Sequence, residues 1–295
     1  MGGDVHACRA AQQDGGPECA VPRAGSAAAC SGQGRDDPLA VRFLSPEFRL
    51  LAGAARLPPV RRLLEMTIDH RWPCARPGVV ARTRLIDQVV LRELGHVGQV
   101  LILGAGFDTR AWRLPGMDEV RVFELDHPAT QAAKQHALRH SGRSASRVSF
   151  VPVVFGADDP ARALTAAGFT AGAPALVLWE GVTNYLDRDA VDATFGLLAS
   201  ILGSGSLVLF TYVDAGMLDG SAVFAGAQTT MRAVRRVGEP FTFGFVPSQL
   251  PGYLAARGLE LLSDERVSDA ARPYYPAGRC PAAPAYYHVA ESRKR

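Results

Sequence analysis

The sequence has no hydrophobic run that approaches the roughly 20 apolar residues needed to span a bilayer. Its first residues lack the basic segment and the apolar segment of a secretory signal peptide. The formal net charge is only +3 over 295 residues, too little to favour nucleic acid or an anionic membrane surface as a partner. We therefore expect a cytoplasmic protein that binds neither nucleic acid nor membrane.

Closely spaced cysteines are also missing. The five cysteines form no C-x-x-C pair, whereas a structural zinc site usually has four tightly spaced ligands. We expect reduced, unpaired thiols at Cys8, Cys19, Cys30, Cys74 and Cys280. His136 and His140 are four residues apart in a predicted helix and could share a metal ion, but no third ligand lies near them in the sequence. No metal site is predicted.

Large apolar side chains are scarce in residues 1–36. Such a segment cannot bury enough surface to offset the entropy lost on ordering, so we predict that it is disordered. The rest of the chain has an ordinary globular composition, with 47% apolar and 21% charged residues overall. We expect a single domain over residues 37–295, and we interpret "SRKR" (292–295) as a solvated end.

Residues 37–97 carry apolar side chains at helical spacing and predict a helical cap before the sheet, with its strongest helix at 78–94. Strands then alternate with helices, which predicts a mainly parallel α/β sheet. A helix at 247–258 and a closing antiparallel pair at 259–267 and 283–290 follow a stretch without clear periodicity. The parallel strands are expected at 99–103, 119–125, 148–155, 175–180 and 206–213.

A glycine pair follows the first predicted strand, in "VLILGAGFDTR" (100–110). Gly104 and Gly106 allow positive φ and a close approach of a ligand to the backbone. The dinucleotide fingerprint requires a third glycine where this chain has Thr109, and Asp108 adds a negative charge where a diphosphate would lie. Both features disfavour NAD and favour a neutral or cationic nucleoside such as S-adenosylmethionine. The alternative is a plain strand-to-helix turn.

Two carboxylates and one arginine are candidate ligand-binding groups. Asp126 lies 20 residues after Gly106, where a carboxylate commonly accepts from ribose hydroxyls; a solvated strand end is the alternative. Glu124 shares its face of the strand. Glu180 ends the fourth strand, at the edge where open α/β sheets bind ligands. Arg82 could pair with a ligand carboxylate, although helix geometry alone favours a surface position.

Five motifs follow one another along the chain: "ARTRLID", "LILGAGFDTRAWRL", "FELDHPATQAAK", "LVLWEGVTNYL" and "GEPFTFGFVPSQLPGYLAARGLE". Their combination and order resemble the leucine carboxyl methyltransferase family, in particular its bacterial branch of O-methyltransferases of secondary metabolism. The resemblance covers roughly residues 40–290 and implies a Rossmann-like class I methyltransferase with a seven-stranded sheet. It also implies a substrate lid over residues 214–246.

The resemblance implies S-adenosyl-L-methionine as cofactor. Arg82 would hold its carboxylate, Gly104 and Gly106 its methionine moiety, and Asp126 its ribose. Glu180 would lie near the amino group or the reacting end. One position departs from the family pattern, which has an acid after the third strand to accept from the adenine amino group. This chain has Val154 there, followed by Phe155, whose N–H could still reach adenine. The acceptor is missing unless Asp158 or Asp159 supplies it, and its loss predicts weaker cofactor binding.

Methyl transfer to a carboxylate needs alignment but no general base, because a carboxylate is already ionised near neutral pH. A hydroxyl acceptor would benefit from a base, for which His127 and Glu180 are the candidates. His127 is interpreted first as a helix-start residue, and Tyr185 either orients substrate or packs in the core. Arg232, Arg235 and Arg236 could attract an acidic substrate, although a solvated basic face is the simpler interpretation.

We therefore predict an S-adenosylmethionine-dependent O-methyltransferase that acts on a carboxylate or hydroxyl of a small molecule or peptide. Two alternatives remain: a cofactor-binding homologue without turnover, and an NAD-dependent oxidoreductase. The sequence indicates neither the substrate nor the oligomeric state.

Overall fold

The computed structural model describes residues 37, 39–72, 75–139, 147–236, 238–274 and 283–295. The predictions for residues 1–36, for all five cysteines and for His140 concern positions outside these ranges.

The described residues form one seven-stranded sheet with the strand order β3-β2-β1-β4-β5-β7-β6. The first five strands are parallel, and β7 pairs antiparallel with both β5 and β6. The fold class predicted from the alternation and from the family resemblance is confirmed. The strands are β1 (Gln99–Leu103), β2 (Arg121–Asp126), β3 (Val148–Pro152), β4 (Leu176–Trp179), β5 (Leu207–Val213), β6 (Leu259–Arg266) and β7 (Tyr287–Lys294).

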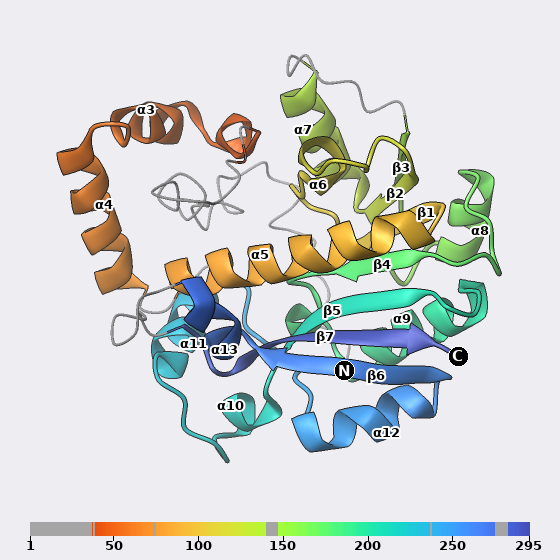
Figure 1. Ribbon diagram of the computed structural model, residues 1–295. Helices are drawn as coiled ribbons and strands as arrows, with labels where there is room; N and C mark the ends of the chain where they lie inside the picture. The colour runs from red at the N-terminus through yellow and green to blue at the C-terminus, as the bar shows by residue number, and fades with distance from the viewer. Residues whose placement is uncertain (1–36, 38, 73–74, 140–146, 237, 275–282) are drawn as a thin grey trace.

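The central strands are apolar on both faces because helices cover both. Every residue of β1, β4 and β5 is buried, as is usual in a parallel sheet. Alternate residues of β1 enter different cores: Val100 and Ile102 pack with helix α5 (Ala75–Glu93), whereas Leu101 and Leu103 pack with helix α9 (Arg188–Ile201). Figure 1 shows α5 lying along the sheet.

The remaining helices surround this framework. Helices α3 and α4 stand away from the sheet, on the side toward which β4 and β5 run (Figure 1). The other elements are η2 (Ala40–Phe43), α3 (Pro46–Ala54), α4 (Pro58–Arg71), η3 (Leu94–His96), α6 (Arg110–Arg113), α7 (Pro128–Leu138), α8 (Pro160–Ala166), η4 (Thr183–Tyr185), α10 (Ala215–Asp219), α11 (Ala227–Arg236), η5 (Pro247–Gln249), α12 (Leu250–Ala255), α13 (Val267–Ala271) and η6 (Arg272–Tyr274).

One local expectation is wrong. The stretch 292–295 is not a solvated end, because β7 continues to Lys294 between β5 and β6. Ser292 is fully buried and its hydroxyl donates to the carbonyl of Val208. Arg293 reaches Glu93 of α5, at 3.3 Å. A short basic sequence therefore completes the sheet because its alternate side chains point to opposite faces.

Candidate functional site

The glycine pair forms a tight turn between β1 and α6. Gly104 has φ +59° and Gly106 has φ +46°, a region that side-chain-bearing residues seldom adopt. The Gly104 N–H donates to the carbonyl of Leu125 at 2.8 Å. A β-carbon at Gly104 would lie 2.6 Å from Cγ2 of Val182, in the segment after β4. The turn therefore lies close against the ends of two neighbouring strands.

Asp126 joins this turn from the end of β2. Its carboxylate accepts from the N–H of Gly106 and, at 2.6 Å, from its neighbour His127. Burial raises the pKa of Asp126, and these two N–H donors partly offset the rise. The structure thus brings together the two residues that the 20-residue spacing singled out. A carboxylate oxygen can accept more than one donor, so hydroxyls of a ligand could still reach it.

Asp108 and Thr109 are engaged inside the protein. The Asp108 carboxylate accepts from Nη1 of Arg110 at 2.6 Å and from the Arg110 N–H at 2.7 Å. Burial raises the pKa of Asp108, but the charges of Arg110 and Lys134 and the Arg110 N–H together lower it by more, so the net shift is downward. The Thr109 hydroxyl donates to Asp37 at 2.5 Å. The negative charge that Asp108 adds to this turn is therefore paired with Arg110 inside the protein, and Thr109 replaces the third glycine.

Arg82 and Glu180 meet at the end of β4. Nε of Arg82 forms an ion pair with Oε1 of Glu180 at 2.7 Å, and its N–H has no hydrogen-bond partner of good geometry among the described residues. The guanidinium also lies 5.2 Å from the centre of the Tyr287 ring. Burial lowers the pKa of Arg82, and Glu180 and Tyr287 more than offset this. The surface position that helix geometry alone favoured is wrong, because Arg82 is turned toward the sheet edge.

A residue that was quoted in the motif but given no role lies at the centre of this region. The Arg110 side chain is 4% exposed and contacts three carboxylates. Its Nη1 donates to Glu180 and to Asp108, each at 2.6 Å, and its Nε donates to Asp87 at 2.8 Å. Burial lowers the pKa of Arg110, but these carboxylates raise it well above its usual value. Arg113 holds the same Asp87 with both of its terminal nitrogens.

A second buried ion pair was also missed. Lys134 of α7 donates to Oε2 of Glu124 at 2.6 Å, and both side chains are almost completely buried. The Lys134 ammonium lies 4.9 Å from the centre of the Trp112 ring. Burial raises the pKa of Glu124 to about 7, even though Lys134 lowers it. Glu124 therefore supports the strand interior and does not share the ligand edge with Asp126.

Tyr185 and Phe155 are both partly exposed, at 39% and 45%. The Tyr185 ring packs edge-on against Phe241, with ring centres 5.4 Å apart. Partial burial raises the pKa of Tyr185, so the phenol stays protonated. His127 begins α7, where its Nδ1 accepts from the Ala129 N–H at 3.2 Å. This contact fits a helix-start residue better than a general base.

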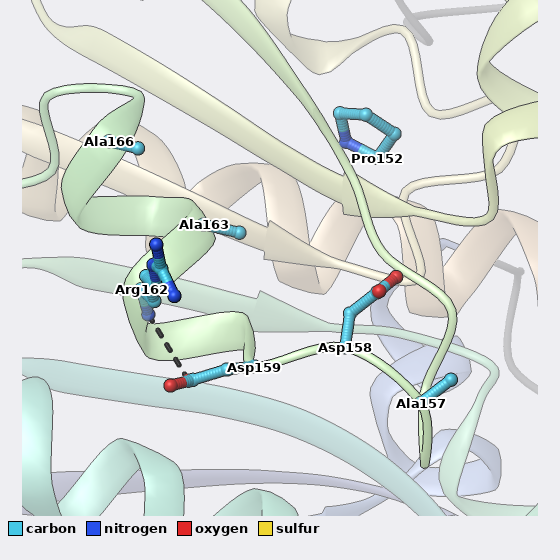
Figure 2. A pocket seen from close by; sticks show the side chains of 7 residues that line it. All are labelled: Pro152, Ala157, Asp158, Asp159, Arg162, Ala163 and Ala166. Carbon is cyan, nitrogen blue, oxygen red and sulfur yellow. Dashed lines mark hydrogen bonds between the residues drawn. The ribbon is translucent and has the colours of Figure 1, made fainter.

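The loop after β3 has an acid close to Val154. Oδ2 of Asp158 accepts from the Val154 N–H at 2.7 Å, whereas Asp159 caps α8 by accepting from the N–H groups of Ala161 and Arg162. Figure 2 shows the two carboxylates turned in different directions. They line a shallow hollow of about 470 Å³. Asp158 and Asp159, the two candidate replacements for the missing acceptor, line this hollow, whereas Arg82, Asp126 and Glu180 do not.

Neither a metal cluster nor a membrane helix is present in the described part of the chain. No group of three His, Cys, Asp or Glu side chains is placed there to hold a metal ion. No helix within these ranges has the length and apolarity needed to cross a membrane.

Known proteins resemble this chain in sequence and in fold. A family model described as "Leucine carboxyl methyltransferase" matches residues 19–199, more than half of the chain. A Mycobacterium tuberculosis protein named "Putative S-adenosyl-L-methionine-dependent methyltransferase" is 37% identical over 173 residues, which is 58% of this chain and 52% of that protein. A Mycolicibacterium gilvum protein of the same name is 41% identical over 144 residues, or 48% of this chain and 46% of that one. The chain thus spans about half the length of these curated relatives.

Two solved structures share the fold. A "putative methyltransferase" from Thermobifida fusca superposes with a TM-score of 0.56 at 16% identity, over 80% of this chain and 88% of that one. A DUF574 family protein from Streptomyces avermitilis gives a TM-score of 0.55 at 19% identity, over 80% and 91% of the two chains. At such low identity the likeness concerns the fold alone.

Proposed function

Because the chain belongs to the leucine carboxyl methyltransferase family, we propose that it transfers a methyl group from S-adenosyl-L-methionine to a carboxylate or hydroxyl of a small molecule or peptide. The observation that carries the proposal is the convergence of four elements on one sheet edge. The glycine turn after β1, Asp126 at the end of β2, Glu180 after β4 and Arg82 of α5 lie together there. Open α/β sheets bind their ligands at this edge.

The residues present suit both ends of this cofactor. Arg82 has a buried Nε N–H without a hydrogen-bond partner in the described structure, and a ligand carboxylate would satisfy it. Glu180 would accept from the ligand ammonium. The turn at Gly104 and Gly106 would line the methionine moiety with its backbone, and Asp126 would accept from the ribose hydroxyls. The Phe155 N–H would face adenine.

When bound, S-adenosylmethionine supplies an electrophilic methyl group on a sulfonium. The chain's part is to align the acceptor with that group, which is a proximity effect. We propose that residues 214–246 form a lid and residues 37–97 a cap over the acceptor, with Tyr185 orienting it. The phenol of Tyr185 suits a hydrogen-bond donor better than a base, because partial burial raises its pKa. A carboxylate acceptor of the secondary-metabolite type would need no base.

The test is transfer of label from methyl-labelled S-adenosylmethionine to a panel of aromatic and aliphatic acids and phenols. Transfer to at least one compound is expected. Calorimetry should detect binding of S-adenosylhomocysteine and no binding of NADH. The variant Arg82→Gln should weaken S-adenosylhomocysteine binding by about tenfold or more, since it removes a charge-assisted contact. Cofactor binding without transfer would favour a silent homologue, and binding of NADH alone would favour the oxidoreductase.

A further inference from the structure

We infer that Arg110 is a positioning residue. It holds the Glu180 carboxylate in place while Arg82 changes partner from Glu180 to the cofactor. The inference rests on the proposed function, because it concerns the amino-acid end of the same cofactor. It assigns to Arg110 a role through Glu180 and no contact with the reacting atoms.

The geometry of Glu180 carries the first step. Its two oxygens have different partners: Oε1 lies 2.7 Å from Nε of Arg82, and Oε2 accepts from Nη1 of Arg110 at 2.6 Å. The contact with Arg110 is a hydrogen bond, whereas the contact with Arg82 leaves the Arg82 N–H without a hydrogen-bond partner in the described residues. Arg82 is therefore the partner that can separate from Glu180 without breaking a hydrogen bond.

Arg110 itself cannot follow Glu180 if the carboxylate moves. Its Nε is held by Asp87 at 2.8 Å and its Nη1 also by Asp108 at 2.6 Å. These residues come from α5 and from the loop after β1, and the Arg110 side chain is 4% exposed. A rigid guanidinium fork fixed at two other points gives Glu180 a fixed anchor. A lysine has no such fork, since its ammonium is a single point charge.

The charges of the region suit a ligand that carries both an anion and a cation. Three arginines face three carboxylates in one connected set, so the set is balanced before a ligand enters. An amino-acid group adds one charge of each sign. Arg82 would then pair with the ligand carboxylate, and Glu180 would take the ligand ammonium while it keeps Arg110. The set consists of Arg82, Arg110, Arg113, Asp87, Asp108 and Glu180.

Without Arg110, Glu180 would have Arg82 as its arginine partner in this set. The carboxylate would then be drawn fully onto Arg82, and the two groups that the amino-acid end needs would neutralise each other. Ligands that carry the amino-acid group would then bind more weakly, whereas ligands that lack this group would bind as before. A general loosening of the fold would instead weaken both kinds of ligand.

The experiment compares Arg110→Lys with the matched control Arg113→Lys by calorimetry. Arg113 lies on the same helix and pairs with the same Asp87, but its ion pair does not include Glu180. The two ligands are S-adenosylhomocysteine and 5′-methylthioadenosine, which shares the adenosine but lacks the amino-acid group. We expect R110K to weaken the binding of S-adenosylhomocysteine by about tenfold or more. The binding of methylthioadenosine should weaken by less than about twofold. R113K should change neither by more than about twofold.

A kinetic comparison adds a second readout. R110K should raise KM for S-adenosylmethionine and leave kcat at saturating cofactor nearly unchanged, because Arg110 does not touch the reacting atoms. Should R110K fail to fold, Asp108→Asn replaces it. That variant weakens the second anchor of Nη1 and keeps the side-chain shape, and it should give the same split between the two ligands, smaller in size.

The outcomes separate the inference from the function on which it rests. Equal losses for both ligands in R110K, or no loss for either, would overturn the inference alone. Arg113→Lys behaving like Arg110→Lys would do the same. Wild-type protein that binds neither ligand would overturn the proposed function, and the inference with it.

Discussion

At residue 154 the chain has a valine where the family pattern has an acid, and the structure offers a replacement four residues later. The Asp158 carboxylate accepts from the N–H of Val154 itself, so it lies next to the place where the side chain of an acid at 154 would begin. We predict that Asp158 accepts from the adenine amino group. Asp158→Asn should then weaken the binding of both S-adenosylhomocysteine and methylthioadenosine by about fivefold or more, as measured by calorimetry.

Asp159→Asn is the matched control for this prediction. Asp159 caps α8, so its amide variant should lower stability by up to about 1 kcal/mol and leave both affinities unchanged. Val154→Asp should restore binding in the Asp158→Asn background. If Val154→Asp alone strengthens binding while Asp158→Asn has no effect, the acceptor is missing in this chain and Asp158 does not replace it.

The residues that the sequence could identify are those with a local or periodic signal. Gly104 and Gly106 follow an apolar strand, and Asp126 has a spacing that the sheet geometry explains. Arg110 has a weaker signal: it lies two residues after Asp108, close enough for the contact that the structure shows. Lys134 and Glu124 lie ten residues apart on different elements, and the chain between them does not reveal that they pair. Such partners depend on how elements pack, which spacing alone does not determine.

At the scale of elements, the turn after β1 and the segment after β4 constrain each other. An alanine at Gly104 would combine positive φ with a contact of 2.6 Å to Val182. We predict that Gly104→Ala lowers the free energy of unfolding by about 2–5 kcal/mol, from backbone strain and overpacking together. Urea unfolding monitored by circular dichroism would measure it.

Gly106→Ala isolates the backbone part of that effect. Gly106 also has positive φ, but its β-carbon would meet nothing nearer than a carbonyl oxygen at 3.9 Å. Gly106→Ala should lower the free energy of unfolding by only about 1–2 kcal/mol. Val182→Ala should recover part of the loss in Gly104→Ala and none in Gly106→Ala. Equal losses in the two glycine variants would show that the close approach to Val182 does not matter.

Most strands could be predicted within a few residues because they are short apolar runs bounded by turn residues. The first strand, 99–103, has the predicted limits. The third was predicted to reach residue 155 but ends at Pro152, because the apolar residues Val153 to Phe155 continue into a loop. Helix α11 lies in the stretch where no period was found. Its apolar residues are few and Ala227 is its one buried residue, so the contrast between its two faces comes mainly from its arginines and not from an apolar stripe.

At the scale of the whole molecule, the buried pair between Glu124 and Lys134 ties global stability to pH. Burial raises the pKa of Glu124 to about 7 in the folded protein, above the value of about 4.3 expected in an unfolded chain. The folded state therefore binds the proton more tightly, and this group stabilises the protein most below its unfolded pKa. That contribution is lost as pH rises through the folded pKa. We predict that the unfolding free energy of wild type relative to Glu124→Gln falls between about pH 4.5 and 7 and is flat above.

Guanidinium titrations of the two proteins at several pH values would measure this difference, in which the contributions of the other titratable groups largely cancel. Lys134→Met supplies the control, because Lys134 lowers the pKa of Glu124 and its removal should extend the decline to higher pH. A difference that stays constant from pH 4 to 8 would mean that Glu124 is ionised throughout. Its pairing with Lys134 would then outweigh burial, and the interior beneath the glycine turn would hold a permanent ion pair and not a titrating one.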